Sequence, residues 1–145
     1  MIVIDANVAM KWFIPEKGMK EAIALLRSNQ KLVAPSIIEY EVVSGFVRRV
    51  RKEELSTGEA TEHRNEWLRQ IAHETIHLFD TSALLNPASE LAYELRHPLY
   101  DCIYLALALK YGAPLVSADG PLIERANACG YKVYALHEVE SILKA

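Results

Sequence analysis

The chain has 145 residues, an ordinary length for one domain with one hydrophobic core, and we expect residues 1–145 to form a single domain. Hydrophobic residues make up 51% of the sequence, which allows a sizeable core and leaves apolar surface for self-association. The net charge of −3 argues against binding of nucleic acid by charge over the whole surface, although it leaves room for a local basic patch.

Signals for membranes and secretion are missing from the sequence. No apolar run approaches the ~20 residues that span a bilayer, and no basic segment at the start precedes an apolar region with a cleavage site. Cys102 and Cys129 lie in apolar helical contexts without the spacing of a metal site, so we expect two buried thiols rather than a disulfide. These observations predict a soluble cytoplasmic protein that makes no membrane contact.

Short apolar runs alternate with helical stretches along the whole chain. In chain order we expect a strand at 1–4, helices at 8–13 and 17–29, a strand at 32–34, helices at 36–52 and 56–72, a strand at 75–79, a helical stretch at 80–96 with an irregularity at Pro87, a helix at 98–111, a strand at 115–117, a helix from 119 to about 129, a strand at 131–134 and a helical tail at 137–144. This alternation predicts a parallel sheet covered by helices on both faces, but the pattern does not give the order of the strands.

Two aspartates directly follow apolar strands. Asp5 ends the first run and Asp119 follows the strand at 115–117, and a helix comes next in both places. In open α/β sheets the carboxyl ends of the strands form the edge where ligands and chemistry collect. The alternative for each aspartate is that it only caps the following helix.

Two further acids lie on expected helices. Glu41 shares a helix face with Ile37 and Ile38, and a glutamate on such a buried face is costly unless it has a partner. Asp101 lies in the first turn of a helix that is apolar all round and is therefore expected to be central. The alternatives are a structural arginine partner for Glu41 and a favourable contact with the helix dipole for Asp101.

Four converging carboxylates repel one another unless a cation neutralises them, and Mg²⁺ and Mn²⁺ prefer oxygen ligands. One or two such ions suit the hydrolysis of a phosphodiester, because the metal lowers the pKa of a bound water, orients the phosphate and stabilises the leaving oxygen. Asn7 and Ser117, beside the strand-end acids, would hold waters or a phosphate oxygen, or serve only as turn and cap residues. Asp80 also ends a strand, but we leave it out of the site because Asp80-Thr81-Ser82 reads as a helix cap.

Several motifs follow one another in a family-like order and spacing: VIDANV at 3–8, KWFIPE at 11–16, APS at 34–36 followed by Glu41, PLYDCIYLALA at 98–108 and LVSAD at 115–119. On these motifs the sequence resembles the PIN-domain family, and in particular the VapC-type toxins of toxin–antitoxin pairs. The resemblance covers nearly the whole chain. One position departs from the family pattern, because Ser44 stands where an asparagine is often found three residues after the helix glutamate.

The resemblance implies a three-layer α/β/α domain with a central parallel sheet of about five strands in the order 3-2-1-4-5. It implies an endoribonuclease that depends on Mg²⁺ or Mn²⁺, cleaves RNA, forms a homodimer and has a small antitoxin partner that blocks the cleft. Carried over position by position, its catalytic and metal-binding acids are Asp5, Glu41, Asp101 and Asp119, with Asn7 and Ser117 as supporting polar groups.

A basic cluster marks the end of the helix at 36–52. It consists of Arg48, Arg49, Arg51 and Lys52. The cluster predicts either contacts with RNA phosphates, on a path that Lys11, Arg64 and Arg69 would extend, or simply a solvated face that complements the helix dipole. Trp12 and Trp67 have the chemistry to stack on bases, but packing in the core or an interface is the preferred interpretation for both.

Two other functions compete with the nuclease. A non-catalytic PIN-fold module that binds RNA or protein would have no evident need for all four acids. A phosphotransfer enzyme of the haloacid-dehalogenase type would use Asp5 as its nucleophile and a second aspartate two residues later as general acid. Asn7 occupies that second position and cannot act as an acid, which counts against this function.

Overall fold

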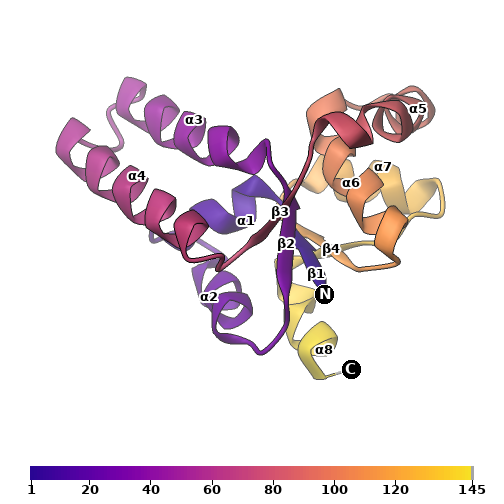
Figure 1. Cartoon of the computed structure of the whole chain (residues 1–145), viewed down its shortest axis with the longest axis horizontal. Coiled ribbons are helices and arrows are strands. Elements are labelled where there is room, and N and C mark those ends of the chain that lie inside the picture. Colours follow the sequence, from indigo (N-terminus) through magenta and orange to yellow (C-terminus); the bar gives the residue numbers. More distant parts are fainter. Residues whose placement is uncertain (145) are drawn as a thin grey trace.

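The computed structural model describes residues 1–144, and its centre is a single sheet of five short parallel strands (Figure 1). The strands are β1 (Ile2–Ile4), β2 (Leu32–Pro35), β3 (His77–Phe79), β4 (Leu115–Ser117) and β5 (Val133–Ala135). Their order is β3-β2-β1-β4-β5, and every neighbouring pair is parallel. The parallel sheet and the strand order 3-2-1-4-5 are therefore confirmed.

Helices connect the strands and cover both faces of the sheet. They are α1 (Ala6–Met10), α2 (Met19–Arg27), α3 (Ile38–Arg51), α4 (Thr57–Ala72), α5 (Leu85–Leu95), α6 (Leu99–Tyr111), α7 (Gly120–Ala128) and α8 (Val139–Lys144), with short 3₁₀ turns at Ser82–Leu84 and Leu136–Glu138. Helices α1 to α4 lie on one side of the sheet and α5 to α7 on the other, while α8 packs against α2 (Figure 1). Within residues 1–144, no helix combines the length and the apolar character needed to cross a membrane.

The hydrophobic core lies between these layers. Strand β1 is buried along its whole length, because it has a neighbouring strand on each side and helices on each face. Helix α6 is buried from Cys102 to Ala108, as its uniformly apolar sequence predicts. Trp67 is fully buried, and its Nε1 donates to the carbonyl of Glu39 at 3.2 Å, so this ring packs in the core and is not free to stack on a base.

Three local predictions are wrong. The first helix begins at Ala6 instead of residue 8, because Asp5 already caps it. The irregularity in the stretch at 80–96 falls at the junction of the 3₁₀ turn with α5. Pro87 lies in the first turn of α5, where backbone N–H groups have no partner within the helix, so a proline is tolerated there. Cys129 is exposed, because it follows the last turn of α7 as its C-cap residue; Cys102 is buried as expected.

Candidate functional site

The four acids singled out in the sequence lie at one edge of the sheet. From β1 the chain continues to β2 on one side, and from β4 it continues to β5 on the opposite side. The order of the strands therefore reverses between the adjacent central strands β1 and β4. Asp5 directly follows β1 and Asp119 follows β4, and the pairing of Ile4 with Val116 brings both strand ends to the same level. This is the crevice outside the carboxyl ends of the strands in which open α/β sheets bind their ligands.

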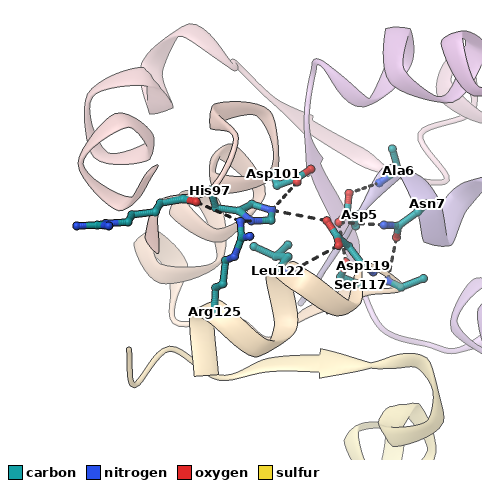
Figure 2. Close-up of polar contacts among 11 residues, drawn as sticks. Asp5, Ala6, Asn7, His97, Asp101, Ser117, Asp119, Leu122 and Arg125 are labelled. Atoms are coloured by element: carbon teal, nitrogen blue, oxygen red, sulfur yellow. Dashed lines mark hydrogen bonds and ion pairs between the residues drawn. The ribbon is translucent and has the colours of Figure 1, made fainter. Parts of the chain in front are cut away.

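Asp5 is the most deeply buried of these acids, with 3% of its surface exposed. Its Oδ1 accepts a hydrogen bond from the backbone N–H of Ala6 at 2.8 Å (Figure 2). Its Oδ2 accepts from the hydroxyl of Ser117 at 2.8 Å and from the side-chain amide of Asn7 at 3.4 Å. Asp5 therefore caps α1 with one oxygen and presents the other to the polar groups of the crevice, so its cap role and a role in a site are compatible.

Asn7 and Ser117 connect the ends of the two central strands. The backbone N–H of Ala118 donates to the side-chain oxygen of Asn7 at 3.0 Å, and that of Asp119 donates to the hydroxyl of Ser117 at 3.0 Å. Asp119 in turn caps α7 by accepting from the N–H of Leu122 at 3.4 Å. The two supporting residues thus fix the turns that carry the strand-end acids.

Glu41 projects from α3 and has a tyrosine as its partner. The hydroxyl of Tyr104, a fully buried residue of α6, donates to Oε1 of Glu41 at 2.6 Å. The structural arginine considered from the sequence is therefore replaced by an uncharged donor. Ser44, which stands where the family often has an asparagine, is exposed. The hydrogen bond that orients Glu41 comes from Tyr104.

Asp101 and Asp119 share a residue that the sequence analysis missed. Nε2 of His97 lies 2.7 Å from Oδ2 of Asp101 and 3.6 Å from Oδ2 of Asp119 (Figure 2). Ligand atoms of these three residues lie within 4.8 Å of one another, close enough to surround one ion. His97 stands four positions before Asp101, but Pro98 separates it from α6, so helical spacing gave no reason to pair the two.

The acids influence one another electrostatically. Burial raises the pKa of Asp5 to about 7; the hydrogen bond from Ser117 opposes this effect, and the charges of Asp101 and Glu41 add to it. Burial also raises the pKa of Glu41, and the charge of Asp101 again contributes. The pKa of Asp101 is raised by burial and by the charge of Asp119. Asp101 is thus close enough to each of the other three acids to repel it, and Asp5 also repels Glu41.

The donors in this cluster are carboxylate oxygens, which fit Mg²⁺ or Mn²⁺ better than softer metals. A divalent cation would also relieve the repulsion that raises these pKa values. Asp80, by contrast, is exposed and accepts from the backbone N–H of Ser82 at 3.1 Å. The N-cap of the turn that follows is Thr81, so Asp80 stabilises the local chain reversal instead of capping a helix, and it lies outside the cluster.

The predicted basic path divides into paired and exposed residues. Glu16 accepts hydrogen bonds from Nζ of Lys11 at 3.0 Å and from Nη2 of Arg49 at 2.7 Å. Arg69 pairs with Glu66 at 2.6 Å. The remaining basic residues of the path are exposed, namely Arg48, Arg51, Lys52 and Arg64. Lys11 and Arg49 therefore form an internal ion-pair network in this structure, and the exposed residues are the ones whose position suits a contact with a polyanion.

The sequence profile of the PIN domain matches residues 2–127. The chain belongs to the PIN domain family. Ribonuclease VapC3 of Pyrobaculum aerophilum is 27% identical over 124 residues, which cover 86% of this chain and 93% of that relative.

Solved structures share the fold at lower sequence identity. PAE2754 of Pyrobaculum aerophilum aligns over 99% of this chain and 94% of its own, with a TM-score of 0.70 and 16% identity. A toxin–antitoxin complex from Klebsiella pneumoniae includes a chain that aligns over 82% of this chain and 87% of its own, with a TM-score of 0.59 and 19% identity. At these identities the likeness establishes the PIN fold.

Proposed function

We propose that this chain is a metal-dependent endoribonuclease that hydrolyses RNA phosphodiester bonds at Asp5, Glu41, Asp101 and Asp119. The observation that carries the proposal is the mutual interaction of these acids at the reversal point of the sheet, where burial and repulsion raise three of their pKa values. The name of the related ribonuclease VapC3 supports the reaction class and the substrate.

The four acids would hold one or two Mg²⁺ or Mn²⁺ ions. When bound, such an ion supplies activation of the attacking water and stabilisation of the leaving oxygen. The negative charges of the four carboxylates favour binding of a divalent cation. The cation offsets the repulsion between carboxylates that are partly or fully removed from water.

The polar residues around the acids set their orientation. The Ser117 hydroxyl donates to Asp5 and accepts from the backbone of Asp119, so one small side chain positions both strand-end acids. Tyr104 holds Glu41 in the same crevice. Such pre-formed support reduces the reorganisation needed when a metal and a phosphate bind.

RNA would approach along the exposed basic end of α3. Arg48 and Arg51 are free to contact phosphates, whereas Arg49 is held by Glu16. Contacts of this kind position a nucleic acid without reading its sequence. An RNA substrate also agrees with the cytoplasmic location expected from the sequence.

We further propose a toxin role, with a small antitoxin protein as partner. Support comes from the fold shared with a chain of the Klebsiella toxin–antitoxin complex. An apolar groove between α3 and α4, lined by Val43, Phe46, Val47 and Val50 with Arg51 and Arg64 beside them, offers a place for apolar and acidic side chains of such a partner. Co-expression with the product of an adjacent small gene, followed by purification of one complex, tests this role.

A homodimer is the proposed assembly. Large apolar side chains are exposed on α5 and α6, namely Tyr93, Tyr100, Leu109 and Tyr111. An interface over these helices would remove them from water. Light scattering of the purified protein should give twice the mass of one chain, and Leu109→Glu should shift it toward the monomer.

The decisive experiment is cleavage of a pool of single-stranded and structured RNAs in Mn²⁺, Mg²⁺ or EDTA, beside the variant Asp5→Asn. We expect cleavage that requires both the metal and Asp5. Metal-independent cleavage, or equal cleavage by Asp5→Asn, would contradict the proposal.

The non-catalytic binding module is distinguished by a second measurement. Because metal that binds only the folded state stabilises it, millimolar Mn²⁺ should raise the melting temperature of the nuclease. Absence of both cleavage and metal-induced stabilisation would favour the binding module.

A further inference from the structure

His97 occupies a position between the acids that the proposed reaction does not yet use. It lies between α5 and α6, and only 4% of its side chain is exposed. Its Nε2 faces Oδ2 of Asp101 at 2.7 Å and Oδ2 of Asp119 at 3.6 Å, as Figure 2 shows. The first distance is that of a hydrogen bond, and the second is a longer electrostatic contact.

The opposite side of the ring is held by Arg125 from α7. Nη1 of Arg125 lies 2.9 Å from Nδ1 of His97 and 3.1 Å from the backbone carbonyl of Arg96. A guanidinium has only donors and does not lose its proton in proteins. Nδ1 must therefore accept this hydrogen bond, which it can do only without a proton of its own.

This contact determines the tautomer of the ring. With Nδ1 unprotonated, the ring proton is on Nε2, which then donates to Asp101. A protonated Nε2 has no lone pair for a metal, and the lone pair of Nδ1 is occupied by Arg125. Although its distances to Asp101 and Asp119 would allow coordination, His97 is a donor to the acids and not a third ligand.

We infer that His97 is a positioning residue, which uses its Nε2–H to hold Asp101 beside Asp119 for a divalent cation, with Arg125 fixing the ring in the required tautomer. This inference rests on the proposed metal-dependent function. A donor fixed behind one carboxylate oxygen leaves the other oxygen for the metal, and loss of such a donor typically weakens metal affinity about 10- to 100-fold.

The tautomer is measured directly by ¹H–¹⁵N correlation spectra of the imidazole nitrogens. The chain has five histidines, so the signals of His97 are assigned as those lost in His97→Gln. We expect a protonated Nε2 and an unprotonated Nδ1, with no change when Mg²⁺ is added. Arg125→Met should allow the other tautomer to appear, whereas Arg125→Lys, which keeps a donor, should not. A proton on Nδ1, or loss of the Nε2 proton on adding Mg²⁺, would overturn the inference.

A matched pair of variants then tests the positioning role. The amide nitrogen of glutamine reaches about as far as Nε2 of histidine and can still donate to Asp101, whereas the asparagine amide reaches only as far as Nδ1. By calorimetry with Mn²⁺, His97→Gln should bind within about threefold of the unchanged protein, and His97→Asn about tenfold or more weakly. Melting curves in EDTA show whether both variants fold.

The outcomes separate this inference from the proposed function. If His97→Gln and His97→Asn have the same affinity for Mn²⁺, His97 does not act as a donor to the site. The inference then fails, while the nuclease proposal stands. If the predicted order of affinities is found but the unchanged protein cleaves no RNA, the nuclease proposal fails and the positioning role stands. If the unchanged protein binds no Mn²⁺, both fail.

Discussion

Tyr104 and Glu41 are joined by a hydrogen bond of 2.6 Å between helices that lie on opposite sides of the sheet (Figure 1). The tyrosine is fully buried, and its phenol has its pKa raised well above the ordinary value, first by burial and then by the charges of Asp5 and Glu41. The hydroxyl therefore keeps its proton and acts as a permanent donor to the glutamate. This bond links the outer layers at the candidate site.

Removal of this donor should weaken both the fold and the site. In Tyr104→Phe, the Glu41 carboxylate loses the hydrogen bond that the neutral hydroxyl donates to it. A hydrogen bond to a charged group typically contributes about 1.5–3 kcal/mol. Part of that loss is recovered through water, because Glu41 is half-buried. We expect a lower free energy of unfolding in urea and a weaker affinity for Mn²⁺. The control is Tyr40→Phe, since Tyr40 is 71% exposed and lies outside the proposed dimer interface. Equal behaviour of the two variants would show that the Tyr104 hydroxyl does not support the site.

Asp101→Asn should separate stability from activity. Burial and the charge of Asp119 raise the pKa of Asp101, so an uncharged amide should increase the melting temperature of the metal-free protein near pH 8. The same change should abolish cleavage and remove most of the stabilisation by Mn²⁺. Asp80→Asn is the matched control, because Asp80 is exposed and makes only a local contact with the backbone of Ser82. Cleavage at an undiminished rate in Asp101→Asn would make this acid a purely structural one.

The strand-end acids could be predicted from the sequence because each one depends on a local pattern. An apolar strand followed by a helix places Asp5 and Asp119 at the carboxyl edge, whatever the order of the strands. The order itself depends on contacts between distant segments, and it followed only from the resemblance to the PIN-domain family. The burial of α6 was predictable for a local reason too, since a helix without a polar face must be covered on all sides.

The partners of these acids could not be predicted. Tyr104 lies 63 positions from Glu41, and Arg125 lies 28 positions from His97, so no sequence window contains either pair. The pairing of Arg49 could not be predicted for the same reason, because its partner Glu16 lies 33 positions away. Side-chain contacts of this kind decide which charges are available for binding.

Within the basic cluster, Arg48 is exposed whereas Arg49 is paired with Glu16, and this difference predicts how each affects RNA binding. Arg48→Ala removes an exposed charge, so we expect weaker binding of single-stranded RNA in EDTA and a shallower dependence of affinity on salt, by about 0.7 in the slope of log K against log [salt]. Fluorescence anisotropy over a range of salt concentrations measures both. Stability should change by less than about 0.5 kcal/mol, as for most surface substitutions.

Arg49→Ala should behave in the opposite way. The hydrogen bonds from Arg49 and Lys11 outweigh the effect of partial burial and hold the pKa of Glu16 below its ordinary value, so loss of Arg49 should lower the free energy of unfolding. The salt slope of RNA binding should stay close to that of the unchanged protein. If Arg49→Ala reduces this slope as strongly as Arg48→Ala, the ion pair with Glu16 opens when RNA binds, and the basic cluster acts as one surface.

The pKa of Asp5 predicts how stability depends on pH. Its folded-state pKa is about 7 against an ordinary value of 3.8. Between these values the unfolded chain has released the proton that the folded chain keeps, so the stability of the metal-free protein should fall as pH rises and level off above about pH 7. The difference corresponds to a loss of about 4 kcal/mol at 1.36 kcal/mol per pKa unit. Urea unfolding in EDTA between about pH 5 and pH 8 covers about two of these pKa units and should show a loss of about 3 kcal/mol.

Asp5→Asn and Mn²⁺ test whether Asp5 is the cause. The amide does not titrate, so Asp5→Asn should flatten most of the pH dependence and should be more stable than the unchanged protein near pH 8. Mn²⁺ should restore stability to the unchanged protein most strongly above pH 7, because there it binds a carboxylate that is already ionised. A stability that rises with pH in EDTA would mean that the charge of Asp5 is well satisfied without a metal, and that the cluster needs no cation.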